Sequence, residues 1–338
     1  MTSHKFTRLF FSLAALIVLA ASALAGAAPT NVGVSDQKAG SVLAFPYYTS
    51  LGSSDTRLTI SNTGNYSNNV HMFFIGADCA QADQYICLTA NASASFLASE
   101  YDPSNSGYLL AVSVDDRGTP ISNNSLIGNA FVNDGNYVGN YGAEAFWSKL
   151  PFMRPTSKIG ADMTATLNFD GTFYDYLPTQ HVAEIQSPND SVGQRILVAG
   201  LNGSLINGSL GSSAQAGIGL AYNDGEKPGS YSNPFGGSCL RSFIVSPTTP
   251  RVPGGLGSIA GINNNALIPA GRTGTLKWNT TGSVGLILTP KQGTNKWSGI
   301  RTLHKTGVRL DGSLVIPVFD APNCIGWADD SVVVIVAP

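Results

Sequence analysis

The chain has 338 residues, of which 12% are charged and 43% hydrophobic, and its formal net charge is −2. This charged share is about half that of an ordinary soluble domain. The charge balance argues against nucleic acid or an anionic membrane as a partner, because both require a clustered basic surface that neutralises phosphate. Ser, Thr, Asn, Gly and Tyr are therefore expected to cover most of the surface.

Residues 1–25 have the pattern of a secretory signal peptide. Lys5 and Arg8 precede an uncharged apolar run, residues 9–24, which closes with the small residue Ala25. We therefore expect cleavage before Gly26 and a mature protein in the periplasm, at the cell surface or outside the cell. Removal of the two basic residues leaves 17 basic against 21 acidic side chains, a formal charge of −4. No stretch of eighteen apolar residues follows, so no membrane span is expected in the mature chain.

The mature chain holds four cysteines: Cys79, Cys87, Cys239 and Cys324. An even number of cysteines in an exported protein predicts two disulfides. We favour the pairs Cys79–Cys87 and Cys239–Cys324. The first closes a short loop between two strand-like runs, and the second closes a long loop, which stabilises by about 4 kcal/mol in the chain-entropy model. Zinc is the alternative, but the chain has neither a Cys-x-x-Cys pair nor a nearby His pair.

The remaining chain is predicted to be almost entirely β. Short runs with alternating polarity, or rich in branched and aromatic residues, are typical of strands; they lie at 56–61, 70–75, 109–114, 164–169, 195–199, 284–288, 314–319 and 332–336. Asp-Gly pairs at 170–171 and 311–312 each lie between two strand-like runs and predict hairpins, because both turn residues need positive φ. Further Asp-Gly and Asn-Gly turns are expected at 134, 202, 207 and 224.

One segment, Tyr141 to Leu150, has helical periodicity, with Glu144 near its start and Lys149 near its end. The length left after cleavage favours two β-sandwich domains over one core. Two prolines bracket a break in the strand pattern at 150–155, so we place an N-terminal domain at 26–150 and a C-terminal domain at 156–338. The proline-rich stretch 246–255 is an alternative boundary, or a long loop if Cys239 bonds Cys324.

Two stretches near the N-terminus resemble the opening strands of an immunoglobulin-like sandwich: Ala39-Gly40-Ser41-Val42-Leu43-Ala44-Phe45-Pro46-Tyr47-Tyr48 and Asp55-Thr56-Arg57-Leu58-Thr59-Ile60-Ser61-Asn62-Thr63-Gly64. In many secreted bacterial domains of that kind a strand ends in Ser-Asn-Thr and is followed by a turn and a strand similar to residues 69–75. The resemblance covers roughly residues 35–135. It implies a fold and not an activity.

The sequence contains no nucleophile elbow, metalloprotease helix, phosphate-binding loop or haem attachment motif. Of the histidines that remain after cleavage, His71 lies in a predicted strand, opposite Met72, and is expected at the surface or an edge; His304 has a similar setting. Two carboxylates across a cleft would support glycoside hydrolysis. The candidates, which no spacing links, are Glu144, Glu184, Glu226, Asp224 and Asp175. Solvated turns and strand ends are the simpler interpretation.

No cofactor is expected, apart from a structural calcium ion. The tight turns at 168–171 and 223–226 gather oxygen ligands, which makes Asp170, Asp224 and Glu226 the candidate metal ligands. Neither turn fits the twelve-residue calcium loop, and calcium takes six or more oxygens.

Aromatic residues support a binding role. Trp278, Trp297 and Trp327 lie beside Asn, Gly or Lys, and exposed rings next to amides suit sugars or protein partners. The alternative places each tryptophan in the core of a sandwich. Strands of low charge that are rich in Asn, Ser and Gly are also poorly protected against edge pairing, which predicts self-association.

Three functions remain. The favoured one is an exported, non-enzymatic structural or interaction protein of the cell surface or extracellular matrix. The second is a glycan- or protein-binding β-sandwich module. The third is a secreted hydrolase with dispersed acidic residues.

Overall fold

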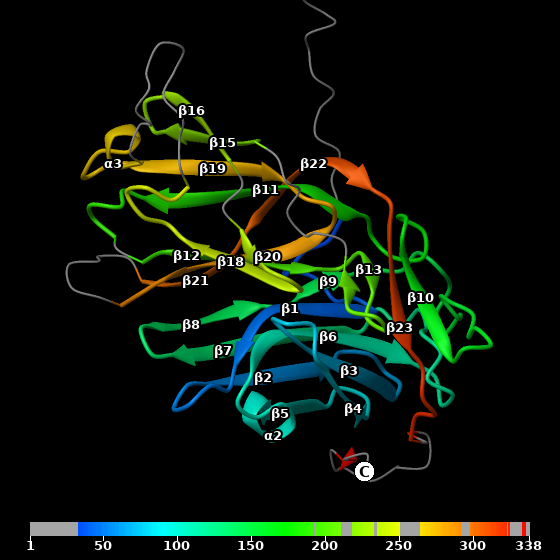
Figure 1. Ribbon diagram of the computed structural model, residues 1–338. Coiled ribbons are helices and arrows are strands. Elements are labelled where there is room, and N and C mark those ends of the chain that lie inside the picture. Colours follow the sequence, from blue (N-terminus) through cyan, green and yellow to red (C-terminus); the bar gives the residue numbers. More distant parts are fainter. Residues whose placement is uncertain are drawn as a thin grey trace, which may run out of the picture. The chain divides into compact units, whose positions relative to one another are not determined.

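The computed structural model in Figure 1 describes residues 33–191, 193–210, 218–232, 235–250, 264–291, 298–322, 324 and 333–335. The predicted signal peptide lies outside the described residues. Within them the fold is nearly all β, as predicted, and the two helices are single turns, α2 (Ala98–Tyr101) and α3 (Asn264–Leu267). No helix of the described residues is long and apolar enough to cross a membrane.

The first half of the chain forms two antiparallel sheets that pack face to face. The inner N-terminal sheet has the order β24-β4-β3-β6-β1-β9; its strands are β1 (Val42–Thr49), β3 (Asn68–Gly76), β4 (Gln81–Leu88), β6 (Ser106–Val114), β9 (Glu144–Phe146) and β24 (Val333–Ile335). The outer N-terminal sheet has the order β5-β2-β7-β8; its strands are β2 (Asp55–Asn62), β5 (Ser93–Leu97), β7 (Leu126–Asp134) and β8 (Tyr137–Gly142).

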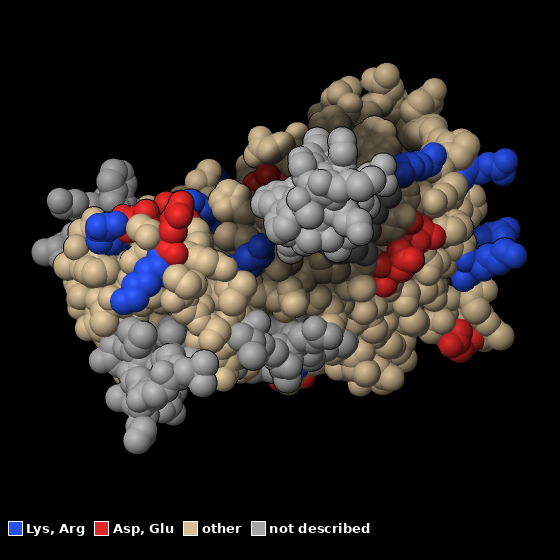
Figure 2. Space-filling view, turned by 90° about the horizontal axis from the view of Figure 1, so that it is seen from above, with Lys and Arg blue, Asp and Glu red and all other residues tan. Residues whose placement is uncertain are grey.

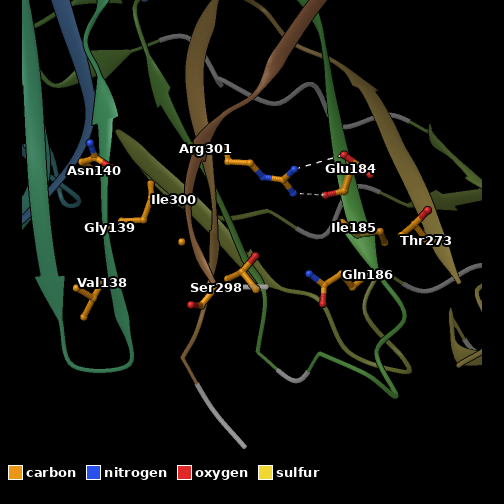
Figure 3. Close-up of a pocket in the computed structure, with 12 residues that line it drawn as sticks. Val138, Gly139, Asn140, Glu184, Ile185, Gln186, Thr273, Ser298, Ile300 and Arg301 are labelled. Carbon is orange, nitrogen blue, oxygen red and sulfur yellow. Dashed lines mark hydrogen bonds and ion pairs between the residues drawn. The ribbon is translucent and has the colours of Figure 1, made fainter. Parts of the chain in front are cut away.

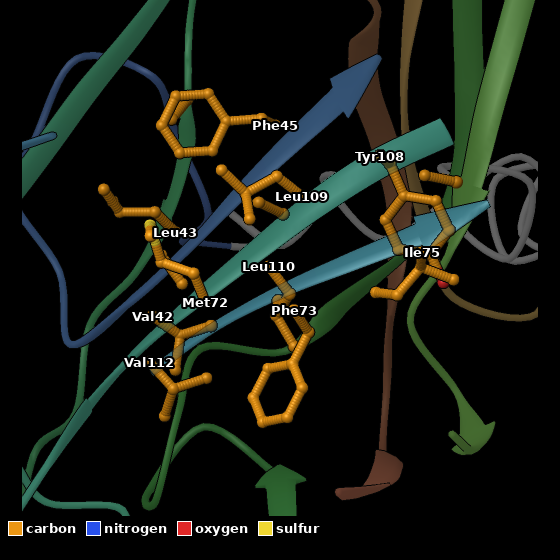
Figure 4. Packing of buried hydrophobic residues seen from close by; sticks show 14 of the residues in the cluster. Val42, Leu43, Phe45, Met72, Phe73, Ile75, Tyr108, Leu109, Leu110 and Val112 are labelled. Atoms are coloured by element: carbon orange, nitrogen blue, oxygen red, sulfur yellow. The ribbon is translucent and has the colours of Figure 1, made fainter. Parts of the chain in front are cut away.

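Both faces of the inner N-terminal sheet are buried, which explains why β1 and β3 have no exposed position. Successive side chains of a strand point to opposite faces. Phe45 therefore faces the outer sheet, where it lies beside Gly128 of β7. Val42, Val112 and Phe73 face the other way (Figure 4). The sheet is thus a central layer and not one wall of an isolated sandwich.

The second half repeats the arrangement. The inner C-terminal sheet has the order β17-β18-β12-β20-β21; its strands are β12 (Arg195–Gly200), β17 (Gly236–Gly237), β18 (Leu240–Ile244), β20 (Ser283–Thr289) and β21 (Gly299–Thr302). The outer C-terminal sheet has the order β16-β15-β19-β11-β22; its strands are β11 (Leu177–Gln186), β15 (Ile218–Asn223), β16 (Pro228–Ser232), β19 (Thr273–Asn279) and β22 (His304–Leu310).

A fifth sheet, of order β10-β23-β13-β14, lies at one side of these layers (Figure 1). Its strands are β10 (Thr164–Phe169), β13 (Gly203–Ser204), β14 (Ser209–Leu210) and β23 (Gly312–Pro317). Strands β13 and β23 pair in parallel, whereas the other described ladders are antiparallel.

The inner C-terminal sheet is also covered on both faces. Along β12, Ile196 and Val198 belong to the hydrophobic core shared with the outer C-terminal sheet, whereas Leu197 and Ala199 belong to the core shared with the first half. The Tyr108 hydroxyl of β6 donates a 2.9 Å hydrogen bond to the carbonyl of Gly200. The described residues form one compact unit, and the division into domains at 26–150 and 156–338 stays a prediction.

The four cysteines form two disulfides, but the predicted pairing is wrong. Cys79 bonds Cys239, with a Cα–Cα distance of 5.2 Å, and Cys87 bonds Cys324, with 5.6 Å. Cys79 precedes β4 and Cys87 lies near its far end, so the extended strand separates them by roughly 20 Å. A disulfide requires Cα atoms within about 7 Å. Both bridges therefore join segments that are distant in sequence.

The local turn and helix predictions also need correction. The Asp-Gly pair at 134–135 does join β7 to β8, and the pair at 224–225 joins β15 to β16. The Asp-Gly pairs at 170–171 and 311–312, however, do not form the predicted hairpins, because the consecutive strands there lie in different sheets. Strand β10 pairs with β23, and β22 pairs with β11. The segment 141–150 contains strand β9 in place of a helix, because Glu144 to Phe146 pair with β1.

Candidate ligand-binding site

The predicted calcium ligands serve other roles in the structure. The Asp224 carboxylate pairs with Arg272, with Nε–Oδ1 at 2.6 Å. Oδ1 of Asp170 accepts hydrogen bonds from the backbone N–H groups of Thr172 and Phe173, at 2.8 and 2.9 Å. Glu226 is exposed in the β15–β16 turn. Within the described residues no group of His, Cys, Asp or Glu is arranged to hold a metal ion.

The two histidines in the predicted strands differ in burial. His71, expected at the surface or an edge, is fully buried instead. Its Nε2 lies 3.0 Å from Oδ2 of Asp83, and its ring stacks on Tyr85 with centroids 4.1 Å apart. Burial lowers the pKa of His71 despite the Asp83 carboxylate. His71 is buried because a central layer leaves neither face of β3 open. His304 is exposed.

The carboxylates proposed for hydrolysis are mostly bound by cations. Glu144 is fully buried against the Lys305 ammonium group, and burial raises the pKa of its carboxyl. Glu184 pairs with Arg301 at 3.3 Å, and Asp175 pairs with Lys38. Glu184 and Asp224 line one hollow of about 240 Å³, where each already has an arginine partner.

The predicted tryptophan contacts are only partly within the described residues. Trp278 is 4% exposed and packs beside Phe235 and His181 in the core of the second half. Trp278 therefore lies in the core, which is the alternative interpretation given for the tryptophans above. Trp297 and Trp327 lie outside the described residues.

A groove of about 830 Å³ lies between β8, β21 and β11 (Figure 3). Its apolar side chains are Val138, Ile185 and Ile300. Arg301 donates a hydrogen bond to Glu184, so the two charged side chains that line the groove form an ion pair with each other. No aromatic ring of the described residues lines it.

A smaller hollow, of about 440 Å³, has the composition of a ligand platform. We call it the aromatic hollow; it is lined by Gly64, Ser122, Asn123, Asn124, Ser125, Trp147, Ser148, Lys149, Leu150 and Phe152. Trp147 is 44% exposed and Phe152 is 53% exposed. Tyr66 is 65% exposed and lies against Phe152, with ring centroids 5.2 Å apart. Three rings from two connections thus lie beside amide and hydroxyl groups.

The aromatic hollow is built from three connections of the N-terminal sandwich. Tyr66 lies between β2 and β3, residues 122–125 lie between β6 and β7, and residues 147–152 follow β9. The Thr63 backbone N–H and hydroxyl both donate to the Ser125 carbonyl at 2.8 Å. Sequence-distant segments are therefore tied to one another at the hollow.

Hydrogen bonds also fix the segment that carries Trp147 and Phe152. The Asn124 amide accepts a 2.8 Å bond from the Ser148 N–H and donates a 2.7 Å bond to the Ser148 carbonyl. The Ser122 hydroxyl donates to the Leu150 carbonyl at 2.9 Å. The backbone between the two rings is therefore anchored at Ser148 and Leu150, so little ordering is needed before a ligand binds.

Charge around the aromatic hollow is sparse. On the face seen from above in Figure 1, acidic and basic side chains also form only small groups, and most of that face is uncharged (Figure 2). Lys149 is the one charged residue that lines the hollow, and it makes no ion pair within the described residues. Asn123 is 2% exposed, and its Nδ2 has no hydrogen-bond partner among the described residues.

Sequence reasoning overlooked the residues of the aromatic hollow. Trp147 fell inside the predicted helix, and Phe152 fell inside the predicted domain boundary. The available signal was the boundary itself, since a proline-bracketed break in the strand pattern that contains Phe152 indicates a loop with an exposed ring. Tyr66, in a turn rich in Asn and Ser, carried the same signal.

Comparison with known proteins gives this chain no family. No family model and no curated protein matches it. One solved structure, Thermotoga maritima 1070, is 15% identical, covers 32% of this chain and 96% of its own, and has a TM-score of 0.26. The apo form of Pleurotus ostreatus lectin is 10% identical, covers 90% of this chain and 88% of its own, and has a TM-score of 0.13. Neither similarity carries an argument about fold or function.

Proposed function

We propose that this chain is an exported, non-enzymatic interaction protein of the cell surface or extracellular matrix, and that it binds glycans through the aromatic hollow. The observation that carries the proposal is the gathering of Trp147, Phe152 and Tyr66, all exposed, around Asn and Ser side chains. A monomeric soluble protein rarely leaves large rings together at its surface without a partner. Aromatic faces with hydrogen-bonding groups beside them suit sugar rings.

Export is part of this proposal. It is supported by the signal-like sequence of residues 1–25 and by two disulfides, which persist in oxidising compartments. We also propose that the N-terminal pair of sheets is immunoglobulin-like. The antiparallel face-to-face sheets and the sequence resemblance over residues 35–135 support that assignment.

The test is a glycan array followed by calorimetry on the oxidised secreted protein. Trp147→Ala should weaken binding about tenfold, because it removes one stacking face. Phe319→Ala is the matched control, since Phe319 is 48% exposed but neither lines the hollow nor lies on β7. An array without any ligand, or equal losses in the two variants, would overturn the assignment.

Self-association is a second candidate function. The outer face of the outer N-terminal sheet exposes Ile127 and Phe131 on β7 and Leu97 on β5, 39–45% each. Between them lie hydroxyl pairs such as Thr59 with Ser95, at 3.1 Å. Arg57 also lies on this face, between Leu97 and Phe131, and the open surface that these residues form with the hydroxyl pairs suits contact with a second copy, as expected for a structural component.

A further inference from the structure

We propose that the ligand of the aromatic hollow is an acidic oligosaccharide, with sugar rings on Trp147 and on the Tyr66–Phe152 pair and a carboxylate on Lys149. This inference deepens the proposed function and rests on it. It assigns a ligand class to the hollow: the aromatic side chains bind sugar rings, and Lys149 binds a carboxylate.

The arrangement of rings favours more than one sugar. Trp147 and Phe152 both line the hollow but lie on opposite sides of the Ser148–Pro151 stretch in sequence. Tyr66 extends the aromatic surface of Phe152, because the centroids of the two rings are 5.2 Å apart. Trp147 and the Tyr66–Phe152 pair thus offer two aromatic surfaces at one hollow, and an oligosaccharide can use both.

The charge of the hollow favours an anion. Lys149 is exposed, and its backbone N–H is held by the Thr172 carbonyl at 3.0 Å, which fixes the origin of the side chain. Two acids belong to neighbouring segments, and both are already engaged. Asp175 binds Lys38 and the Trp147 N–H, and Asp170 binds two backbone N–H groups. No acidic residue lines the hollow itself, so the Lys149 ammonium group is left for a ligand.

The polar lining supplies neutral contacts to such a ligand. Asn123 lies at the hollow with a buried amide nitrogen that lacks a partner among the described residues. An oxygen acceptor would remove the cost of this unmatched donor. The Asn123 nitrogen has almost no exposed surface, so a sugar hydroxyl accepts from it only when the side chain turns toward the hollow, whereas the exposed Lys149 ammonium group meets a sugar carboxylate directly.

The test compares two probes that differ only in charge: oligogalacturonate and the same oligomer as its methyl ester. Titration calorimetry at low salt should show the acid binding about fivefold more tightly than the ester, the ratio expected for one exposed ion contact. Lys149→Gln should abolish that ratio. Lys158→Gln is the matched control, because Lys158 is exposed in the same segment but does not line the hollow. Trp147→Ala should weaken both probes.

Equal affinity for acid and ester would overturn this inference and leave the proposed function standing. The same holds if neither probe binds while another glycan on the array binds in a Trp147-dependent manner. If nothing on the array binds, both proposals fail. Binding of polyglutamate with the same Lys149 and Trp147 dependence, in the absence of glycan binding, would overturn the sugar class in favour of an acidic peptide.

Discussion

Lys305 of β22 places its ammonium group on the carboxylate of Glu144 in β9, a side chain with no exposed surface. The pair joins the edges of two sheets from opposite halves of the chain. Removing one partner of a buried pair leaves the other charge without compensation. We expect Glu144→Gln to lower the free energy of unfolding by about 3 kcal/mol, measured from urea midpoints.

Glu184→Gln is the matched control, because Glu184 and Arg301 are each about half exposed. An exposed pair contributes at most about 1 kcal/mol. The double variant Glu144→Leu/Lys305→Met should recover most of the lost stability, since an apolar pair avoids the desolvation of two charges. Equal losses for Glu144→Gln and Glu184→Gln would contradict a buried, energetically coupled pair.

Because of His181, the free energy of unfolding is expected to fall in acid. The His181 Nε2–H lies 3.1 Å from the Ser283 carbonyl, and burial, reinforced by the Lys305 charge, lowers its pKa to about 3. The unfolded chain takes up this proton near pH 6.5, before the folded chain does, so stability is lost as the pH falls from about 6.5 to about 3. The loss at pH 4.5 relative to pH 7.5 should reach about 3 kcal/mol.

His181→Gln isolates this contribution. The variant removes the titrating ring, whereas the buried His71, whose pKa is also lowered, titrates in both proteins. The fall in unfolding free energy between pH 7.5 and pH 4.5 should therefore be smaller in the variant than in the original protein. Identical falls would show that His181 is accessible to protons in the folded state.

The bridge between Cys79 and Cys239 closes a loop across a sequence separation of 160 residues. Loss of a loop of this length should cost about 5 kcal/mol in the chain-entropy model. We expect Cys79→Ser/Cys239→Ser to show that loss in urea, and peptide mapping of the original protein under oxidising conditions to give Cys79–Cys239 and Cys87–Cys324. A Cys79–Cys87 peptide would contradict the strand geometry.

The positions of the strands were predictable because strand signals are local in the sequence. The pairing of the strands was not predictable, because it depends on residues that are distant in the sequence. Residues 195–199 form β12 as expected, yet only the stacking of two sandwiches explains why both faces of that strand are buried. Residues 141–150 match a helix in periodicity, yet Glu144 to Phe146 form a strand because β1 offers them a ladder. The disulfide pairs and the aromatic hollow depend on the same long-range placement, which no local pattern encodes.

Ile127 is 41% exposed on the outer face of β7 and offers the clearest test of self-association. A lysine there would place charge in the middle of an apolar contact, which opposes the approach of a second copy. We expect Ile127→Lys to shift the protein from assemblies to monomers in light scattering and negative-stain microscopy. Ile206→Lys is the control, because Ile206 is 51% exposed in the turn between β13 and β14. If the original protein is monomeric at every concentration, the structural role falls and ligand binding by a single copy is the remaining proposal.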